Sequence, residues 1–215
     1  MQKKLGEGAT SVGYKAPRNS MAVVLKIYKP GFEPYAAQEA AIRTHLANND
    51  ITGIDPVTMT DSPCSLSIPE SLYHVEVNPH AHMSDLVECL REAHHANVVH
   101  RDIRPESIMV NNSGTARIID WGCASSSSEA GLALGIKGTF RYASNEVLDA
   151  AINETPRVPQ PKDDLESLVR AGLAINTVSI IDELASLEPG DFVGARAYWQ
   201  GKRAANLLFE ILLKQ

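Results

Sequence analysis

Apolar and polar residues alternate in short runs along the first part of the chain, and turn-forming residues separate the runs. This pattern predicts three antiparallel strands over residues 5–28, the first before a glycine turn, the second at 12–16 and the third at 21–28. Residues 17–20, Pro-Arg-Asn-Ser, predict the turn between the last two strands. The chain is therefore expected to begin with a small antiparallel sheet.

A helix and two further strands are expected next. Residues 35–48 place alanine, isoleucine and leucine at helical spacing. Short apolar runs at 57–60 and 64–68 flank an Asp-Ser-Pro turn signal, and Pro69 ends the pairing. The first part of the chain thus predicts a sheet that carries one helix.

The remainder of the chain changes to a helical period. We expect one long helix that begins at about residue 79 and leads to His100. We expect three further helices over residues 163–175, 178–187 and 192–214. A boundary near residue 69 separates a β-rich part, residues 1–69, from a mainly helical part, residues 70–215. The predicted fold class is α+β with two lobes.

The composition of the chain argues against several classes of function and binding partner. The chain has 215 residues, 44% of them hydrophobic, and its net charge of −6 includes no basic run that would attract nucleic acid or an anionic membrane. Its three cysteines, Cys64, Cys89 and Cys123, form no zinc-type pair and suit a reducing compartment. No signal peptide or membrane span is evident, so we expect a cytoplasmic or intracellular location, although the chain could be an excised domain.

Two acidic residues follow apolar runs and lie in or beside turns. Asp102 stands in the segment Val-Val-His-Arg-Asp-Ile-Arg-Pro-Glu-Ser, and Asp120 stands in Ile-Ile-Asp-Trp-Gly. Such an arrangement suits the joint binding of a hydroxyl nucleophile and a metal-bound phosphate. Turn initiation is the alternative role for each aspartate, but it does not explain the accompanying His100, Arg101 and Pro105.

These two segments resemble the catalytic loop, HRDxKPxN, and the metal-binding motif, DFG, of eukaryotic-type protein kinases. The resemblance implies that Asp102 orients the acceptor hydroxyl and accepts its proton, and that Asp120 binds magnesium or manganese across the phosphates of ATP. Arg104 replaces the lysine expected near the transferred phosphate and keeps its charge. Ser107 replaces an asparagine that ligates the metal, and its hydroxyl reaches less far.

The segment Leu-Gly-Glu-Gly-Ala-Thr-Ser-Val at residues 5–12 resembles the glycine-rich loop of the same family. Gly6 and Gly8 would let backbone N–H groups approach the phosphates, and Ser11 and Val12 complete the nucleotide-binding loop. Taken alone, two glycines between strands are more often an ordinary hairpin.

Lys26, within Val-Leu-Lys-Ile, resembles the phosphate-binding lysine of the family, and Glu39 on the helix is its implied partner. Two alternatives stay open. Lys26 could be a solvated charge on a strand, and Glu39 with Arg43 could form a surface pair one helical turn apart.

Residues 138–146, Gly-Thr-Phe-Arg-Tyr-Ala-Ser-Asn-Glu, resemble the GTxxYxAPE segment. The resemblance implies that Thr139 braces the catalytic aspartate. It also implies that Glu146 forms a buried ion pair with an arginine from the C-terminal helices, for which Arg196 and Arg203 are the candidates.

Two further roles follow from the same resemblance. Asp164 would bond to the backbone of the catalytic loop, whereas Asp163 has the alternative of a helix N-cap. Residues 125–128, four serines in an expected loop, could accept a phosphate that pairs with Arg101. A solvated linker is the competing interpretation of the serines.

The implied activity is magnesium-assisted transfer of a phosphoryl group from ATP to serine or threonine of a protein substrate, with no nucleic-acid or membrane partner. A pseudokinase that binds nucleotide or a partner as a scaffold is the first alternative, because of Ser107. A small-molecule kinase is the second. The phrases HRDIRPES, IDWG, YAS and DDLESLVR also resemble the kinase-like domains of crinkler-type effectors. If the chain is such an effector, this resemblance implies delivery into a host cell. The oligomeric state stays open.

Overall fold

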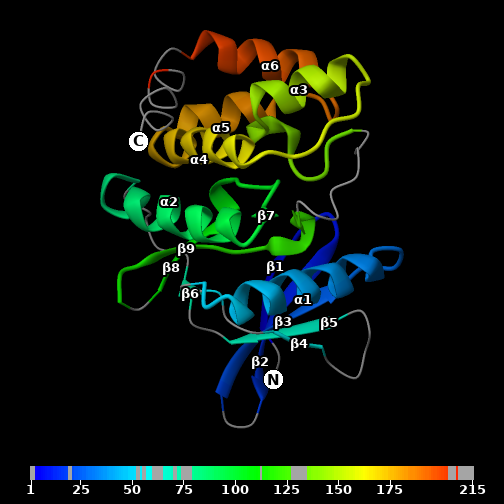
Figure 1. Ribbon diagram of the computed structural model, residues 1–215, viewed down its shortest axis with the longest axis vertical. Helices are drawn as coiled ribbons and strands as arrows, with labels where there is room; N and C mark the ends of the chain where they lie inside the picture. Colours follow the sequence, from blue (N-terminus) through cyan, green and yellow to red (C-terminus); the bar gives the residue numbers. More distant parts are fainter. Residues whose placement is uncertain are drawn as a thin grey trace. The chain divides into compact units, whose positions relative to one another are not determined.

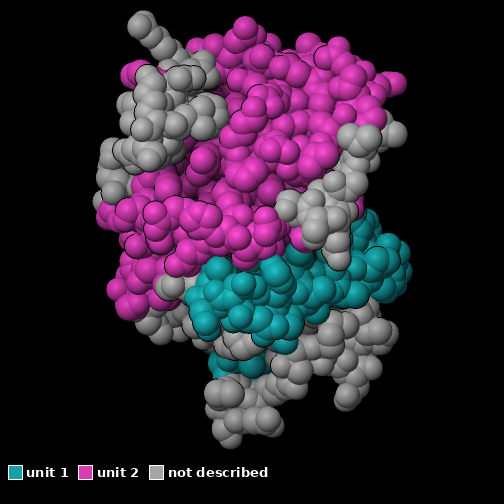
Figure 2. Space-filling model, in the orientation of Figure 1, with its two compact units in different colours: residues 1–72 teal, residues 73–215 magenta. Residues whose placement is uncertain are grey.

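The computed structural model describes residues 3–18, 21–51, 54, 57–59, 65–69, 72–73, 79–111, 113–126, 135–202 and 207. The chain divides into two compact units, Met1–Leu72 and Tyr73–Gln215 (Figures 1 and 2). Each unit has its own secondary structure and its own buried residues, and each is described separately below.

The first unit is a five-stranded antiparallel sheet with one helix (Figure 1). The strands run in the order β1-β2-β3-β5-β4, and the helix packs against β3 and β5. Tyr28 and Ala36 are fully covered where strand and helix meet. The elements are β1 (Lys3–Glu7), β2 (Ser11–Arg18), β3 (Met21–Tyr28), α1 (Glu33–Asn48), β4 (Thr58–Met59) and β5 (Ser65–Pro69).

The turn expected at residues 17–20 begins later than the sequence pattern suggested. Strand β2 continues through Arg18, and Pro17 lies in register with Ala22 of β3. The described register of β1 with β2 ends at Lys15, so the described pairing of Pro17 is the one with β3. The remaining turn residues, and the turn signal at 61–63, lie outside the described residues.

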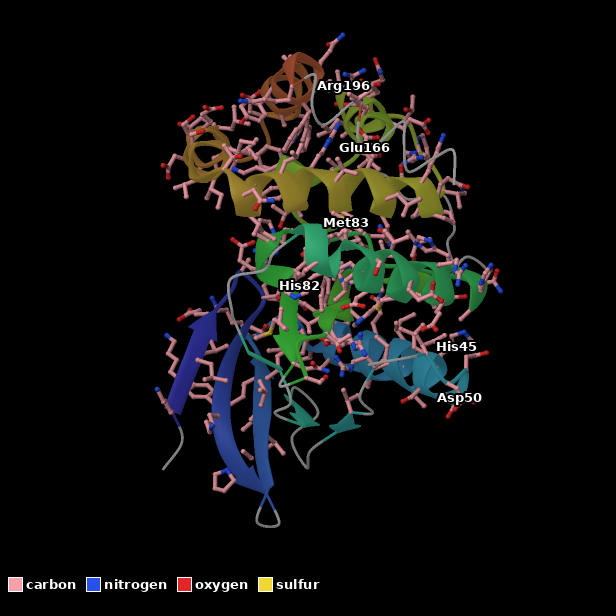
Figure 3. All side chains as sticks on the ribbon, turned by 90° about the vertical axis from the view of Figure 1, so that its left-hand side faces the viewer. His45, Asp50, His82, Met83, Glu166 and Arg196 are labelled. Carbon is pink, nitrogen blue, oxygen red and sulfur yellow. The ribbon has the colours of Figure 1, made fainter. Side chains whose placement is uncertain are left out.

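The second unit is mainly helical. Its helices are α2 (Pro79–His95), α3 (Asn145–Ile152), α4 (Pro161–Asn176), α5 (Val178–Ala185) and α6 (Phe192–Gly201). Met83 lies on the side of α2 that faces α4 (Figure 3). A Cβ atom added to Gly172 of α4 would lie 3.2 Å from the Cε atom of Met83. Glycine at position 172 therefore allows α2 and α4 to pack closely.

Short strands in this unit carry the segments singled out in the sequence. Strand β7 (Val98–Val99) pairs with β10 (Ser125–Ser126), and β8 (Ile108–Asn111) pairs with β9 (Ala116–Ile118) in a sheet that also contains β6 (Leu72–Tyr73). Asp102 lies between β7 and β8, and Asp120 lies two residues after the end of β9. The strand pairings therefore fix both ends of each candidate segment.

Two helices, α3 and α6, differ from the expected ones by more than two residues. The sequence pattern does not predict helix α3, because residues 138–146 indicate only a motif. In the structure Ser144 is its N-cap, and the Ser144 hydroxyl accepts a hydrogen bond from the Val147 N–H at 3.2 Å. In place of one helix over 192–214, α6 ends at Gly201, where Lys202 adopts φ −86° and ψ 82°. Glycine has a low helix propensity, which favours an end at this point. Residues 203–206 and 208–214 lie outside the described residues, and Leu207 is helical.

The antiparallel sheet with one helix and the mainly helical second unit confirm the predicted α+β class. Among the described parts of the chain, no helix has both the length and the apolar character needed to cross a lipid bilayer.

Cys89 on α2 provides a test of the buried core. The residue is 2% exposed, and burial raises the pKa of its thiol to about 11. At pH 8 only about one molecule in a thousand would carry the reactive thiolate, and that fraction rises as the pH increases towards 11. We expect iodoacetamide to leave Cys89 unmodified at pH 8 in the native protein and to modify it readily in denaturant.

Peptide mass spectrometry measures this labelling, and the half-buried Cys123 serves as an internal comparison. Rapid modification of Cys89 in the native protein at pH 8 would contradict the packing of α2.

Candidate active site

His100 links the two candidate segments. Its ring is fully buried and packs edge-on against Trp121, with 4.6 Å between the ring centroids. Nε2 lies 2.9 Å from the carbonyl oxygen of Ile119, and Nδ1 accepts a hydrogen bond from the Asp102 N–H at 3.3 Å. His100 is therefore a structural residue that ties the backbone at Asp102 to the residue before Asp120.

The Asp164 carboxylate holds the turn that precedes Asp102. One oxygen, Oδ2, accepts a hydrogen bond from the His100 N–H at 2.7 Å, and the other, Oδ1, accepts one from the Arg101 N–H at 2.9 Å. His94 lies 2.9 Å from Oδ2 through its Nε2 atom. The contact between Asp164 and this backbone, expected from the sequence, is present.

Two residues of this region have left-handed backbone conformations. Arg101 has φ 72° and Asp120 has φ 65°, values that a residue with a side chain rarely adopts. Such conformations persist when surrounding contacts hold them, and they gather at functional sites. At Arg101 the holding contact is the bond to Asp164.

The Asp102 side chain is 11% exposed and has one oxygen engaged. Its Oδ1 atom accepts a hydrogen bond from the backbone N–H of Thr139 at 2.7 Å, and Arg104 Nε lies 3.7 Å from Oδ2. Thr139 thus contacts Asp102 through its backbone amide. The carboxylate is fixed on one side and faces a guanidinium group on the other.

Gly138 permits the contact between Thr139 and Asp102. It has φ +94°, and an added Cβ atom would lie 2.6 Å from the Arg101 carbonyl oxygen and 2.9 Å from the Asp102 Cβ. No side chain fits at that separation, so the close approach of the two segments requires glycine. The sequence identified Gly138 as part of a motif but did not reveal this steric reason.

Ser107 has a structural role in the turn after Asp102. Its buried hydroxyl accepts a hydrogen bond from the Arg104 N–H and donates one to the Arg104 carbonyl, both at 2.9 Å. Its own carbonyl accepts a hydrogen bond from the Ile119 N–H at 2.8 Å. The hydroxyl proton is thus committed to the local turn, an arrangement that fits a positioning role better than the expected role of metal ligand.

Asp120 begins a 3-10 helix, η2 (Trp121–Cys123), whose first residue is fully buried. Trp121 donates a hydrogen bond from Nε1 to the Ile118 carbonyl at 3.2 Å, so the chain is anchored on both sides of Asp120. A carboxylate oxygen is the ligand that Mg²⁺ prefers. Of the two residues expected to bind the metal, Asp120 therefore fits this role and Ser107 fits it poorly.

In the first unit, Lys26 and Glu39 form the pair expected from the sequence. Lys26 Nζ lies 2.8 Å from Glu39 Oε2, and the two side chains are 13% and 0% exposed. Arg43 is also buried. The two surface interpretations of Lys26 and of the Glu39–Arg43 pair are therefore wrong, because none of these residues lies on a solvated face.

The glycine-containing segment forms the connection between β1 and β2. Gly6 pairs with Gly13, and the Gly8 N–H donates a hydrogen bond to the Ser11 carbonyl at 2.9 Å. A Cβ atom added at Gly6 would meet nothing within 4 Å. This hairpin geometry is compatible both with an ordinary turn and with a phosphate loop, whose roles for Gly6, Gly8 and Ser11 stay predictions.

Val12 does not share the face of Lys26. Residues in register across an antiparallel pair point to the same face of the sheet. Lys26 is in register with Gly13, and Val12 is in register with Ile27. Val12 therefore lies on the opposite face of the sheet from Lys26, and Gly13 is the β2 residue that neighbours Lys26. The role of Val12 in nucleotide binding stays a prediction.

The expected buried ion pair of Glu146 is also wrong. The Glu146 side chain is 54% exposed and contacts Arg157 at 3.2 Å and Lys162 more closely. Arg196 instead bonds to Asp149 at 2.8 Å, and Arg203 lies outside the described residues.

The buried pair in this region is Glu166 with Arg170, one turn apart on α4. Figure 3 labels Glu166 on this helix. Glu166 Oε1 also accepts a hydrogen bond from the Asn145 N–H at 3.0 Å, at the first residue of α3. Burial raises the pKa of the Glu166 carboxyl, and Arg170 opposes that rise. Glu166 thus places a carboxylate at the start of α3, where a negative charge is favourable, and Glu146 in the same helical turn faces solvent.

Tertiary contacts fix residues 139–145 to the helices. Trp199 Nε1 donates a hydrogen bond to the Arg141 carbonyl at 2.6 Å, and the Arg141 guanidinium donates to the Leu184 and Leu187 carbonyls at 2.6 Å each. Arg170 donates to the Ala143 carbonyl and to Asn145. None of these contacts has a sequence signal, since each joins residues far apart in the chain or depends on the packing around them.

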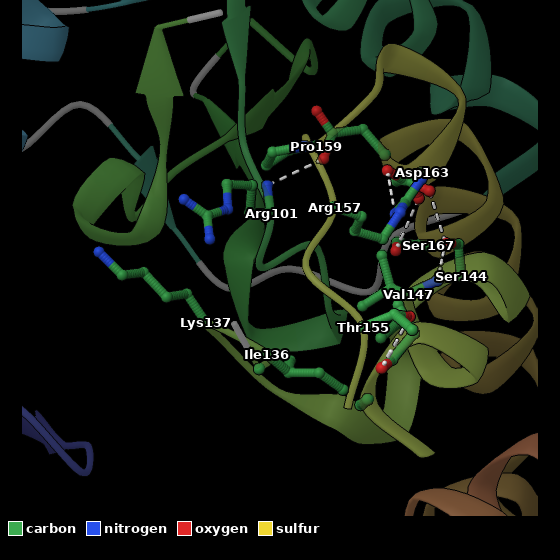
Figure 4. A pocket seen from close by; sticks show the side chains of 15 residues that line it. Arg101, Ile136, Lys137, Ser144, Val147, Thr155, Arg157, Pro159, Asp163 and Ser167 are labelled. Carbon is green, nitrogen blue, oxygen red and sulfur yellow. Dashed lines mark hydrogen bonds and ion pairs between the residues drawn. The ribbon is translucent and has the colours of Figure 1, made fainter. Parts of the chain in front are cut away.

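A small cavity lies beside the start of this segment (Figure 4). Its volume is about 50 Å³, and its lining includes Arg101, Ile136, Val147 and Thr155. Pockets for drug-sized ligands usually enclose 300 Å³ or more, so a nucleotide does not fit here.

The four serines at 125–128 are not all loop residues. Ser125 and Ser126 form strand β10, in register with Val99 and Val98 of β7. The loop conformation expected for Ser125 and Ser126 is therefore wrong. Ser127 and Ser128 lie outside the described residues, and a phosphate on them that pairs with Arg101 stays a prediction.

Comparison with known proteins identifies the family. A model described as "Protein kinase domain" matches residues 1–159. The chain belongs to the protein kinase family. This kinase-family chain is 38% identical over 69 residues to a probable serine/threonine-protein kinase, pknA2, from Bifidobacterium longum, covering 31% of the chain and 9% of that protein. The narrower resemblance to crinkler-type effectors stays a prediction.

Two further relatives carry kinase or receptor names. The chain is 37% identical over 76 residues to activin receptor type-2A from Xenopus laevis, covering 34% of the chain and 15% of the receptor. It is 24% identical over 174 residues to cyclin-dependent kinase-like 1 from Caenorhabditis elegans, covering 72% of the chain and 49% of that protein. The chain thus spans less than half the length of each of these curated relatives.

Gly138→Ala tests the close approach at Asp102. We expect it to lower the free energy of unfolding by about 3 kcal/mol or more, because a strained φ and a backbone clash act together. Gly135→Ala is the matched control, since Gly135 has φ +79° and open space around its Cβ position. It should cost about 1 kcal/mol through strain alone. Urea denaturation measures both, and equal losses would disprove the steric role of Gly138.

Proposed function

We propose that this kinase-family chain transfers a phosphoryl group from ATP to serine or threonine of a protein substrate, with Mg²⁺ or Mn²⁺. The observation that carries the proposal is the held Asp102 carboxylate. Its Oδ1 atom is fixed by the Thr139 amide, and the preceding backbone is fixed by Asp164. Phosphoryl transfer depends mainly on such positioning and on charge neutralisation.

Asp102 acts on the nucleophile in this proposal. With Oδ1 bound to the amide, Oδ2 is the oxygen that orients the substrate hydroxyl and accepts its proton during attack. Arg104 lies 3.7 Å from Oδ2, where its fixed positive charge would attract an incoming phosphate. Asp102 is the base, and Arg104 supplies charge.

Asp120 is the proposed metal ligand. Mg²⁺ bound to its carboxylate would neutralise charge on the phosphates of ATP. The buried Trp121 on one side and the Ile119 bonds to His100 and Ser107 on the other limit the movement of Asp120. The protein thereby supplies a preordered oxygen ligand.

Lys26 in the first unit is proposed to contact the α- and β-phosphates, with Glu39 fixing its ammonium group. The backbone N–H groups around Gly6, Gly8 and Ser11 would bind phosphate oxygens. Gly13, in register with Lys26, leaves the face beside the lysine free of a β2 side chain.

A nucleotide-binding pseudokinase is the second candidate. The observation that favours it is the Ser107 hydroxyl, which is engaged by Arg104 backbone groups. A chain with Asp120 but without a second side-chain ligand could bind ATP and transfer phosphate slowly or not at all. A small-molecule kinase is less favoured, because residues 138–146 resemble a protein-substrate platform.

Incubation with γ-labelled ATP, Mg²⁺ or Mn²⁺ and mixed serine- and threonine-containing peptides tests the activity. We expect labelled peptide from the wild type and a loss of about 100-fold or more from Asp102→Ala, because the base is removed. Asp182→Ala, at an exposed position on α5, is the control and should retain activity. ATP binding by the wild type without transfer would instead favour the pseudokinase.

Asp120→Asn tests the metal assignment, since it removes the anionic ligand at nearly unchanged size. Calorimetry of ATP binding with and without Mg²⁺ should show that Mg²⁺ strengthens binding in the wild type and not in the variant. Asp182→Asn again serves as the control. An unchanged Mg²⁺ dependence in Asp120→Asn would rule out this aspartate as the ligand.

A further inference from the structure

One carboxylate oxygen in the first unit receives two different donors. Glu39 Oε2 accepts a hydrogen bond from Lys26 Nζ at 2.8 Å and another from the Tyr28 hydroxyl. Lys26 Nζ also lies 5.1 Å from the centre of the Tyr28 ring, within the range of a cation–π contact. Each of the three groups therefore contacts the other two.

Burial makes these contacts strong. Glu39 is 0% exposed and Tyr28 is 3% exposed, so neither can exchange its partner for bulk water. Hydrogen bonds to a charged group in such surroundings contribute more than neutral ones. Burial, and then the neighbouring Glu39 charge, raise the pKa of the Tyr28 phenol well above its usual range, so the hydroxyl remains a donor.

The position of Tyr28 joins the strand to the helix. It is the last residue of β3 and packs against Ala36, one helical turn before Glu39 on α1. Phenylalanine would pack in the same space but would leave Glu39 Oε2 with one fewer donor. The buried hydroxyl thus restricts the rotamer of Glu39 from the strand side.

We propose that Tyr28 is a positioning residue that holds the Glu39 carboxylate in place for Lys26, so that the first unit orders this lysine before any nucleotide binds. The proposal rests on the proposed function for the use of the ordered lysine, but not for the ordering itself. It also predicts that α1 stays docked on β3 without help from the second unit.

Chemical reactivity of Lys26 is the test, because it reports on this side chain alone. Competitive acetylation with isotopically labelled acetic anhydride gives the reactivity of each lysine by peptide mass spectrometry. We expect Tyr28→Phe to raise the reactivity of Lys26 about tenfold, as expected for the loss of a hydrogen bond to a charged group. The reactivity of the exposed Lys4 should not change.

Tyr35→Phe is the matched control. Tyr35 packs against the same cluster of Tyr28 and Ala36, so this variant removes a phenol oxygen from the same surroundings. Unchanged or lower reactivity of Lys26 in Tyr28→Phe overturns the proposal, as does an equal increase in Tyr35→Phe. Near-ultraviolet circular dichroism verifies that the compared proteins are folded.

A second arm separates this inference from the proposed function. Addition of ATP and Mg²⁺ to the wild type should protect Lys26 from acetylation if the lysine contacts the phosphates. Absence of protection, together with a Tyr28 effect in the protein alone, would contradict the nucleotide contact and leave the positioning role of Tyr28 intact.

Discussion

The bond between the Asp164 carboxylate and two consecutive backbone N–H groups is the constraint on which the second unit depends. Asp164 is buried on α4, and its two oxygens hold the amides of His100 and Arg101. Arg101 is thereby kept in a left-handed conformation, and the chain turns so that Asp102 meets the Thr139 amide. The position of Asp102 therefore depends on the Asp164 carboxylate.

In the first unit a functional group is also held in place by buried hydrogen bonds, but the groups involved are different. There the ordered group is a side-chain ammonium, and the groups that order it are a carboxylate and a phenol from two elements. A buried charge needs partners on more than one side, because a single contact rarely offsets the loss of hydration. In both units a buried carboxylate therefore accepts hydrogen bonds from more than one donor.

Sequence patterns predicted those features that depend on local order. Helix α1, strand β3 and the Lys26–Glu39 pair followed from spacing and family resemblance, and the family itself is confirmed. The contacts that the sequence did not reveal depend on packing. The Tyr28 bond to Glu39, the register that separates Val12 from Lys26 and the exposure of Glu146 each require knowledge of which faces meet.

The Glu166–Arg170 pair has a consequence for how the second unit folds. Its members lie four residues apart on α4, so the pair can form as soon as that helix does. A pair between Glu146 and an arginine on α6 would first have to close a long loop at a cost in chain entropy. With the pair confined to one helix, α4 carries both charged groups that Asn145, at the start of α3, contacts.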